Sequence, residues 1–200
     1  MAKVEKEAKL TVSLQDYDRV KAAGRVLSCR DQLNVYLHDP SRLHEGLGYL
    51  RVRYEAGREP VATLKVPKGW DGEVREMMEV EVPLREFGPG LFPWPRRLVG
   101  LEDLSGEMAE HFLAHRILRL RRLGWMRNLR CVVELGALGS VELDRTQLPG
   151  GEIHHEVEVE TQDDGALRVL VARIREIAPS AEPSRVGKFS LFLEAVGDIR

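Results

Sequence analysis

The chain has 200 residues, of which 43% are hydrophobic and 31% are charged. A chain of this length and composition can bury a sizeable core, which excludes an intrinsically disordered protein. The 30 lysines and arginines nearly balance the 32 aspartates and glutamates, so the formal net charge is only −2. We therefore do not expect a nucleic-acid binder that depends on bulk positive charge.

The sequence shows no signal for export or membrane insertion. Its first ten residues, MAKVEKEAKL, lack the apolar stretch of a signal peptide, and no apolar run approaches the roughly 20 residues that cross a bilayer. We expect a cytoplasmic protein with no membrane partner. The two cysteines, Cys29 and Cys131, lie near apolar residues and are interpreted as reduced thiols in the core.

The first half of the chain predicts five strands and one helix. The helix spans residues 14–27, where Leu14, Tyr17 and Val20 recur at helical spacing. The strands are expected at residues 3–13, 35–37, 49–55, 61–66 and 74–82. Residues 85–103 hold three glycines and three prolines, which predicts either an irregular surface connection or a mobile lid.

The second half predicts two helices and further strands, for about eight strands in all. One helix is expected over residues 105–123, with Leu113, Ile117 and Leu120 on its apolar side, and the other over 164–178. The strands are expected at residues 129–135, 140–144, 154–161 and, closing the chain, 188–193.

The predicted strands carry charges on one face and apolar side chains on the other, since successive residues of a strand point to opposite sides. An ordinary sheet with its charges in water would give the same alternation. However, a solvent face needs neither three alternating acids at Glu156, Glu158 and Glu160 nor two like charges at Arg51 and Arg53. A closed barrel with an inward charged face and helices packed outside accounts for both. We therefore predict an α+β protein built on a closed antiparallel β-barrel.

Several of these strands also match known motifs. Glu5-Lys6-Glu7-Ala8-Lys9 is an E-x-E-x-K pattern, and EVEVE at 156–160 repeats acids with the same period. With the strands YLRVR at 49–53, TLKVP at 63–67, REMMEVE at 75–81 and SVELD at 140–144, and with Lys188 near the end, the chain resembles the CYTH superfamily, or triphosphate tunnel metalloenzymes. The resemblance covers residues 4 to about 194 and implies one CYTH-like domain over residues 1–200.

The resemblance implies a metal site and a phosphate site. Magnesium prefers oxygen ligands, usually one or two carboxylates with waters and phosphate oxygens. The implied ligands of a first Mg²⁺ or Mn²⁺ are Glu5, Glu7 and Glu158, while Asp144, Glu156 and Glu160 assist or hold a second ion. Arginine and lysine neutralise phosphate oxygens. The implied phosphate-binding residues are Lys9, Arg51, Arg53, Lys65, Arg75, Arg130 and Lys188, and the implied catalytic residues are Glu5, Glu7, Lys9 and Glu158.

The basic residue of the strand after the second helix is ambiguous, because either Arg127 or Arg130 fits the pattern. Parity with Glu134 favours Arg130. His154 shares parity with Glu156, but metal-assisted hydrolysis needs no histidine, so surface roles are expected for His154 and His155.

The implied function is metal-dependent hydrolysis of a triphosphate, with inorganic tripolyphosphate as the default substrate. Thiamine triphosphatase and class IV adenylate cyclase share the same motifs and stay open, and Trp70 or Trp94 could serve a thiamine ring. A non-catalytic module that binds polyphosphate or a phosphorylated ligand is a further alternative. The expected partner is a small triphosphate, with a homodimer possible.

A cluster of arginines lies near the end of the helix expected over 105–123. Arg116, Arg119, Arg121 and Arg122 precede Trp125, a combination that could contact RNA. On a helix with an apolar side, a solvated basic face is the more common reason for such a cluster. We therefore do not expect a nucleic-acid partner.

Overall fold

The structure is a computed structural model and describes residues 3–71 and 73–197. The strands are β1 (Lys3–Thr11), β2 (Arg25–His38), β3 (Tyr49–Glu55), β4 (Val61–Asp71), β5 (Val74–Pro83), β6 (Leu98–Gly100), β7 (Arg119–Glu134), β8 (Ser140–Gln147), β9 (Ile153–Glu160) and β10 (Glu182–Pro183). The α-helices are α1 (Leu14–Ala23), α2 (Gly106–Ala114), α3 (Asp164–Ile177) and α4 (Lys188–Val196).

The strands form one hydrogen-bonded sheet that closes on itself. Its order is β10-β1-β5-β4-β3-β2-β7-β8-β9, and β1 also pairs antiparallel with β9. Eight strands thus complete the circuit, while β10 is added at β1 and β6 pairs only with β7. The prediction of an α+β fold with a closed antiparallel barrel of about eight strands is confirmed.

Contacts within the chain define two compact units, which are described one at a time. The first unit comprises Met1–Val4, Leu33–Lys68 and Met77–Trp125. The second unit comprises Glu5–Gln32, Gly69–Glu76 and Met126–Arg200. The expectation of a single domain over residues 1–200 stays a prediction.

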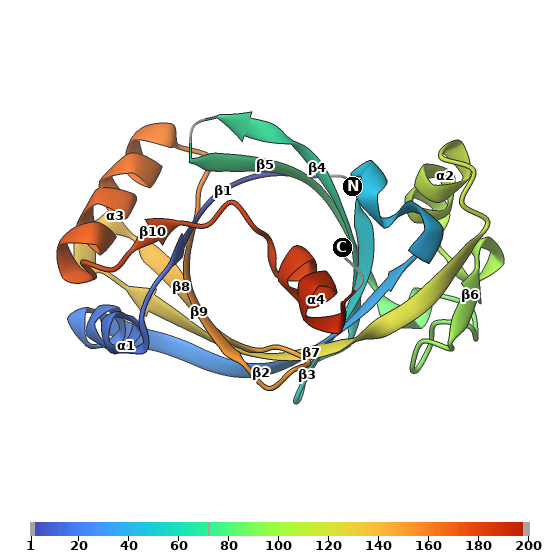
Figure 1. The fold of residues 1–200 in the computed structure, drawn as a ribbon, viewed down its shortest axis with the longest axis horizontal. Coiled ribbons are helices and arrows are strands. Elements are labelled where there is room, and N and C mark those ends of the chain that lie inside the picture. Colours follow the sequence, from blue (N-terminus) through green and yellow to red (C-terminus); the bar gives the residue numbers. More distant parts are fainter. Residues whose placement is uncertain (1–2, 72, 198–200) are drawn as a thin grey trace. The chain divides into compact units, whose positions relative to one another are not determined.

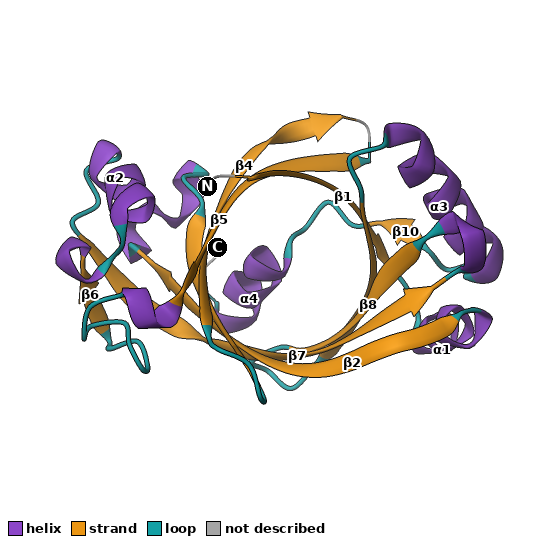
Figure 2. Cartoon of the chain, turned by 180° about the vertical axis from the view of Figure 1, so that it is seen from behind, coloured by secondary structure: helices purple, strands orange, loops and turns teal. Residues whose placement is uncertain are grey.

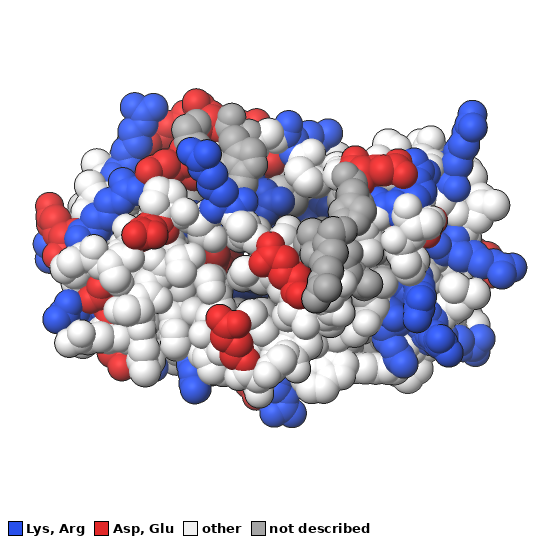
Figure 3. All heavy atoms as spheres, viewed as in Figure 1, with Lys and Arg blue, Asp and Glu red and all other residues white. Residues whose placement is uncertain are grey.

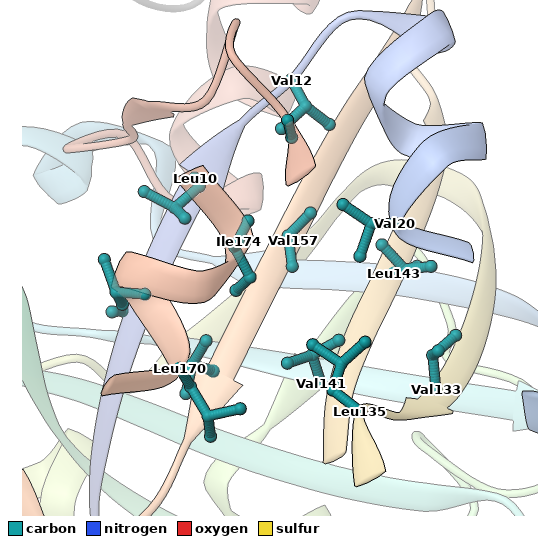
Figure 4. Close-up of a cluster of buried hydrophobic side chains, with 14 of the residues drawn as sticks. Leu10, Val12, Val20, Val133, Leu135, Val141, Leu143, Val157, Leu170 and Ile174 are labelled. Carbon is teal, nitrogen blue, oxygen red and sulfur yellow. The ribbon is translucent and has the colours of Figure 1, made fainter. Parts of the chain in front are cut away.

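The core of the second unit lies on the face of β1, β7, β8 and β9 that α1 and α3 cover (Figures 1 and 2). Strand register fixes this face, because Leu143 pairs with both Cys131 and Val157. Helix α1 contributes Val20, and α3 contributes Leu170 and Ile174, all close-packed against the strands (Figure 4). This apolar layer explains why the charged side chains of the same strands point to the opposite face.

The core of the first unit is built in the same way. Leu50 pairs with Leu64 and Val52 with Ala62, so one face of β3 and β4 is entirely apolar and buried. Helix α2 adds Met108 and Phe112 to this core. In both units the predicted apolar parity is confirmed, with helices on the apolar side.

Residues 85–103 are irregular apart from β6 and two short 3-10 turns, in line with the expected connection. Phe87 and Leu91 are buried in the core of the first unit, and Asp103 accepts a 2.8 Å hydrogen bond from the backbone N–H of Gly90. Whether this segment acts as a lid stays a prediction.

The helix expected over 14–27 ends early. Helix α1 stops at Ala23, and β2 begins at Arg25 and continues to His38, where only a three-residue strand was predicted. The sequence hides this strand because polar residues, Gln32 and Asn34, occupy buried positions in it. Apolar alternation therefore fails as a signal there.

The helix expected over 105–123 is also shorter than predicted. Helix α2 ends at Ala114, Arg116 adopts a left-handed backbone conformation with φ of 58°, and β7 starts at Arg119. The spacing of Ile117 and Leu120 fits a helix. In the structure, Leu120 is buried between two exposed arginines, which is the period of a strand.

The final strand expected over 188–193 is wrong, since residues 188–196 form α4. Alternation of Phe189, Leu191 and Leu193 suggested a strand, whereas the buried residues are Phe189, Phe192 and Leu193, at helical spacing. Six residues can satisfy both periods, and Gly197 at φ 79° ends the helix.

The interpretation of the cysteines as reduced core thiols is also wrong. Cys29 of β2 and Cys131 of β7 form a disulfide with their Cα atoms 4.0 Å apart. Cys131 is fully buried, but Cys29 is exposed. The unpredicted extension of β2 is the cause, because it brings Cys29 alongside β7.

Within the described residues, no helix combines the length and the apolar character needed to span a bilayer. The cytoplasmic location stays a prediction.

Candidate functional site

The inner face of the second unit, the face opposite α1 and α3, carries a buried group of acids. Asp144 on β8 pairs in register with Glu156 on β9, and Glu142 pairs with Glu158. Asp144 and Glu156 are completely buried, and Glu158 is 5% exposed. Side chains two apart on a strand share a face, so this acidic group follows directly from the alternation in β8 and β9.

Three cations are inserted among these acids. The ammonium of Lys188, at the first residue of α4, lies 2.6 Å from Glu158 Oε1 and 2.7 Å from Asp144 Oδ2, and it also bonds to Glu156. The ammonium of Lys9 on β1 contacts Glu158 and lies 2.9 Å from Glu7.

Arg130 on β7 is the third cation among these acids. Its Nε donates to Asp144 Oδ1 at 2.8 Å, and other guanidinium nitrogens bond Glu142 and Glu158. Arg127 is exposed. The parity argument for Arg130 therefore agrees with its place on the charged face.

A neutral hydrogen-bond network adjoins the acids. Asn128 donates to Asp144 Oδ1 at 2.7 Å and to Gln32 Oε1 at 3.1 Å, and Thr146 donates to Asn128 at 2.9 Å. All three polar partners are buried. Sequence reasoning missed these residues, although Asn128 shares parity with Arg130 and Thr146 with Asp144. The network orients Asp144 by satisfying one of its oxygens.

The cations keep most of these buried acids ionised. Burial alone would raise the pKa of Glu158, but Lys188, Lys9 and Arg130 lower it well below its usual value. The pKa of Asp144 is lowered in the same way by Arg130 and Lys188, against the effect of burial. Burial raises the pKa of Glu142, and the neighbouring charges of Glu158 and Asp144 raise it further.

Negative charge is in excess on this face. Among the described side chains, five carboxylates, those of Glu7, Glu142, Asp144, Glu156 and Glu158, form ion pairs with three lysines or arginines, Lys9, Arg130 and Lys188. Fully ionised, this group would carry two uncompensated negative charges. That is the charge of one divalent cation.

The donor set fits such a cation. Oxygen atoms of Asp144, Glu156 and Glu158 all lie within 4.8 Å of one another. Glu156 Oε1 is buried and has no hydrogen-bond partner among the described residues. Carboxylate oxygens are the ligands that hard divalent cations prefer. A buried acceptor without a donor is costly, and a bound cation would satisfy it.

The first unit carries a different charged group. Arg51 pairs in register with Thr63, and Tyr49 with Lys65, so the two cations share the face opposite the α2 core. Lys65 Nζ lies 2.8 Å from Glu79 Oε1, and Arg51 Nη2 lies 3.7 Å from the same oxygen.

Two arginines of this group also donate to neutral side chains. Arg51 Nη2 donates to Thr63 Oγ1 at 3.3 Å, and Arg53 Nε donates to Asn34 Oδ1 at 3.2 Å. Arg51 and Glu79 are buried, while Glu81 is exposed. This group is therefore predominantly cationic.

The remaining predicted site residues are Glu5, Glu160 and Arg75. The side chain of Glu5 lies outside the described side chains, although its backbone belongs to β1. Glu160, expected to assist a metal, is exposed at the end of β9. Arg75, expected to bind phosphate, is half-buried, with its guanidinium beside Gly187.

The histidines occupy opposite faces of β9. His154 has a 15% exposed side chain with Nε2 4.0 Å from Glu156 Oε1, so it borders the acidic group. The ring of His155 packs at a tilt against that of Tyr17 of α1, with the ring centres 5.2 Å apart, and burial lowers the pKa of His155. Both side chains are partly exposed, and their expected surface roles stay a prediction.

The comparisons with known proteins agree with this architecture. Residues 3–190 match the sequence model of the CYTH domain. Among solved structures, a candidate adenylyl cyclase from Hippeastrum with a dominant triphosphatase activity is 23% identical, with a TM-score of 0.77 over 95% of both chains. A candidate adenylate cyclase from Bacillus halodurans is 20% identical, with a TM-score of 0.70 over 96% of this chain and 98% of that one.

A more distant structure is the triphosphatase of the mimivirus capping enzyme, 11% identical with a TM-score of 0.52, covering 87% of this chain and 88% of that one. The curated proteins yield no significant match. These structures are too distant in sequence to show more than a shared fold. The match to the domain model, in contrast, spans almost the whole chain. Together with the charged strand faces, it assigns the protein to the CYTH domain family.

Proposed function

We propose that the protein is an enzyme that hydrolyses a triphosphate with the help of a divalent cation, with inorganic tripolyphosphate as its substrate. The observation that carries this proposal is the uncompensated acidic group around Asp144, Glu156 and Glu158. Its members stay ionised although they are buried, and one buried oxygen still lacks a partner.

Mg²⁺ or Mn²⁺ would be held by Asp144, Glu156 and Glu158, with Glu7 next to Lys9 and Glu158 as a further ligand. Glu5 and Glu160 keep the roles implied by the sequence, as ligands from the ends of β1 and β9. When bound, the cation supplies charge neutralisation at phosphate oxygens and polarises water.

The cations of the protein would bind the phosphates. Arg51, Arg53 and Lys65 share one strand face, and the buried Nε of Arg51 has no hydrogen-bond partner among the described residues, which suits this face to a polyanion. Lys9, Arg130 and Lys188 would exchange some of their carboxylate contacts for phosphate oxygens, and Arg75 would add a further guanidinium. Arginine binds phosphate oxygens in pairs, whereas lysine acts as a point charge.

In the reaction, a water oxygen would bond to the terminal phosphorus while the bridging P–O bond breaks, giving orthophosphate and diphosphate. Phosphoryl transfer needs positioning and charge stabilisation more than covalent catalysis. The role of Lys9, Arg51 and Arg130 is to stabilise negative charge that moves onto the leaving diphosphate.

Relatives support both this reaction and an alternative. The Hippeastrum protein has a dominant triphosphatase activity, which favours hydrolysis. Both this protein and the Bacillus halodurans protein are named as candidate adenylyl cyclases. Cyclisation of ATP is therefore the alternative reaction. Thiamine triphosphate also stays open, and Trp94, which stacks on Tyr54 at 5.0 Å, is its candidate ring platform, since the side chain of Trp70 is not described.

The test is a product assay with tripolyphosphate, ATP and thiamine triphosphate, each with Mg²⁺, Mn²⁺ or a chelator. We expect fastest release of orthophosphate from tripolyphosphate, and none with the chelator. Glu158→Gln keeps the shape of the side chain but removes its charge, and it should lower kcat at least 100-fold. The matched control is Glu134→Gln, because Glu134 pairs with Arg25 at the surface.

If the protein binds polyphosphate tightly but shows no turnover with any metal, its function would be that of a non-catalytic binding module and not of an enzyme. Formation of cyclic AMP as the main product would favour the cyclase. Full activity in Glu158→Gln, with Glu134→Gln also active, would show that the acidic group is not the metal site.

A further inference from the structure

A second charged surface lies in the first unit, away from the strand faces described above. It consists of exposed side chains on β6, on the loop before it and on the start of β7. We call it the arginine ribbon, and its members are Arg96, Arg97, Leu98, Arg119, Arg121 and Trp125. Figure 3 shows lysines and arginines gathered over the region where Figure 1 places β6.

Strand pairing builds the ribbon. Leu98 pairs with Arg121 and Gly100 with Arg119, while Val99 pairs with Leu120 and both of these are fully buried. The ladder therefore directs Arg119 and Arg121 to one exposed side, about 7 Å apart along the strand. The cluster that the sequence suggested on a solvated helix face is thus part of a two-stranded β-ribbon.

Within the part of the chain that the structure describes, the arginines of the ribbon lack acidic partners. Several exposed arginines elsewhere pair with acids, as in Arg25–Glu134, Arg173–Glu176 and Arg175–Glu73. Across residues 3–71 and 73–197, the four arginines of the ribbon form no ion pair. Four such arginines on one exposed surface favour a polyanion as its ligand.

Large apolar side chains accompany these charges. Trp125 is 54% exposed and Leu98 is 50% exposed. At the edge of the ribbon, Trp94 is 40% exposed and is held in place by Tyr54 at 5.0 Å and by Arg122, whose guanidinium carbon lies 6.0 Å from the ring centre. Arg122 is itself fixed by a 2.8 Å bond to the carbonyl of Pro95. Exposed, oriented indole rings offer flat surfaces for stacking.

We propose that the arginine ribbon binds single-stranded nucleic acid. Arginines would contact the phosphates, and Trp125 and Trp94 would stack on unpaired bases, the combination that single-strand binding surfaces use. A membrane surface would instead suit an amphipathic helix with its apolar side chains gathered on one face. The ribbon is independent of the triphosphate site, so either proposal can fail alone.

The test is fluorescence anisotropy with a labelled 20-nucleotide RNA that has a 5′-hydroxyl end. Without a triphosphate, this RNA offers no terminal substrate group to the acidic site. We expect binding at 50 mM salt that weakens at 200 mM, and weaker binding of a duplex of the same length. The same strand as DNA shows whether the sugar matters, and vesicles of anionic lipid test the membrane alternative.

Two charge-reversed double variants carry the comparison. Arg119→Glu/Arg121→Glu should weaken RNA binding at least tenfold and should lower the slope of log affinity against log salt by about 1.4, since each phosphate contact contributes about 0.7. Arg168→Glu/Arg173→Glu on α3 makes the same change in net charge and should weaken binding less than twofold. Trp125→Ala should weaken it on the order of tenfold.

Because reversals in β7 could disturb folding, Arg96→Glu/Arg97→Glu in the preceding loop repeats the test outside a strand, and thermal melts check each variant. Glu158→Gln should bind RNA as the wild type does. Absence of RNA binding at 50 mM salt, equal losses in the ribbon and α3 variants, or binding of vesicles in place of RNA would each overturn the proposal.

Discussion

The charged strand faces of the two units share one sequence pattern but differ in charge balance and burial. In the second unit, Asp144, Glu156 and Glu158 are buried, and each is bonded to at least one of three cations. In the first unit, Lys65 and Arg51 both lie near Glu79, and Arg51 and Arg53 also donate to neutral side chains. Alternation therefore determines which face carries charge, while the sign of the excess charge determines which ligand that face suits.

Removing a cation from the acidic face should have the largest effect on stability. Lys188→Met removes the ammonium that bonds Asp144, Glu156 and Glu158 together, leaving acids that are at most 5% exposed. Breaking a buried ion pair from one side typically costs about 3–5 kcal/mol. We expect a loss of that size in urea unfolding without divalent metal. A loss below about 1 kcal/mol would contradict the inference that these buried acids depend on Lys188 for their stability.

Divalent metal should stabilise the acidic face next most strongly. A ligand at 100 times its Kd raises the free energy of unfolding by about 2.7 kcal/mol. Mg²⁺ or Mn²⁺ at that concentration should therefore raise the Tm of the wild type by several degrees. Asp144→Asn should abolish this rise, while Glu134→Gln should keep it. A metal-induced rise that survives in Asp144→Asn would place the ion elsewhere.

The equivalent change on the cationic face should cost less. Lys65→Met removes one of the two cations near Glu79, whose Oε1 also lies 3.7 Å from Arg51. Because Glu79 keeps a cation, we expect a loss of about 1–2 kcal/mol in urea unfolding. The comparison between the two faces fails if Lys65→Met destabilises the protein as much as Lys188→Met does. Under the proposed function, the same variant should raise KM more than it lowers kcat.

A surface pair gives the smallest effect and calibrates the others. Arg25 and Glu134 have side chains 73% and 38% exposed. Exposed ion pairs contribute about 0–1 kcal/mol. Arg25→Ala should therefore change the free energy of unfolding by less than about 0.5 kcal/mol, with no change in metal response. A larger shift would mean that charge removal destabilises this protein regardless of burial.

The strands with clear alternation were predictable from sequence. In β3 and β9, charges and apolar residues alternate without interruption, so the faces of Arg51 and Glu158 follow from parity alone. The family motifs added the roles, which alternation cannot supply. Elements whose inner residues are neutral and polar were missed, because buried Gln32 and Asn34 look like loop residues in a sequence.

The secondary structure of a short segment near the end of the sequence was also predicted wrongly. Residues 188–193 satisfy both a strand and a helix period, yet Lys188 reaches the acids from either. Lys188 thus lies among the acids although its secondary structure was predicted wrongly, and its phosphate-binding role stays a prediction. The exposed ribbon at the start of β7 could not be found either, since its arginines look the same on a helix and on a strand until β6 pairs with them.

The bond between Cys29 and Cys131 joins positions 102 residues apart. A covalent loop of that length restricts the unfolded chain strongly, and disulfides typically contribute about 2–4 kcal/mol to stability. Thiol reductants at glutathione-like potentials would act first on the exposed Cys29 sulfur. The free energy of folding of this barrel therefore depends on whether its surroundings are oxidising or reducing. Unfolding measured in buffers with and without dithiothreitol would give two different free energies.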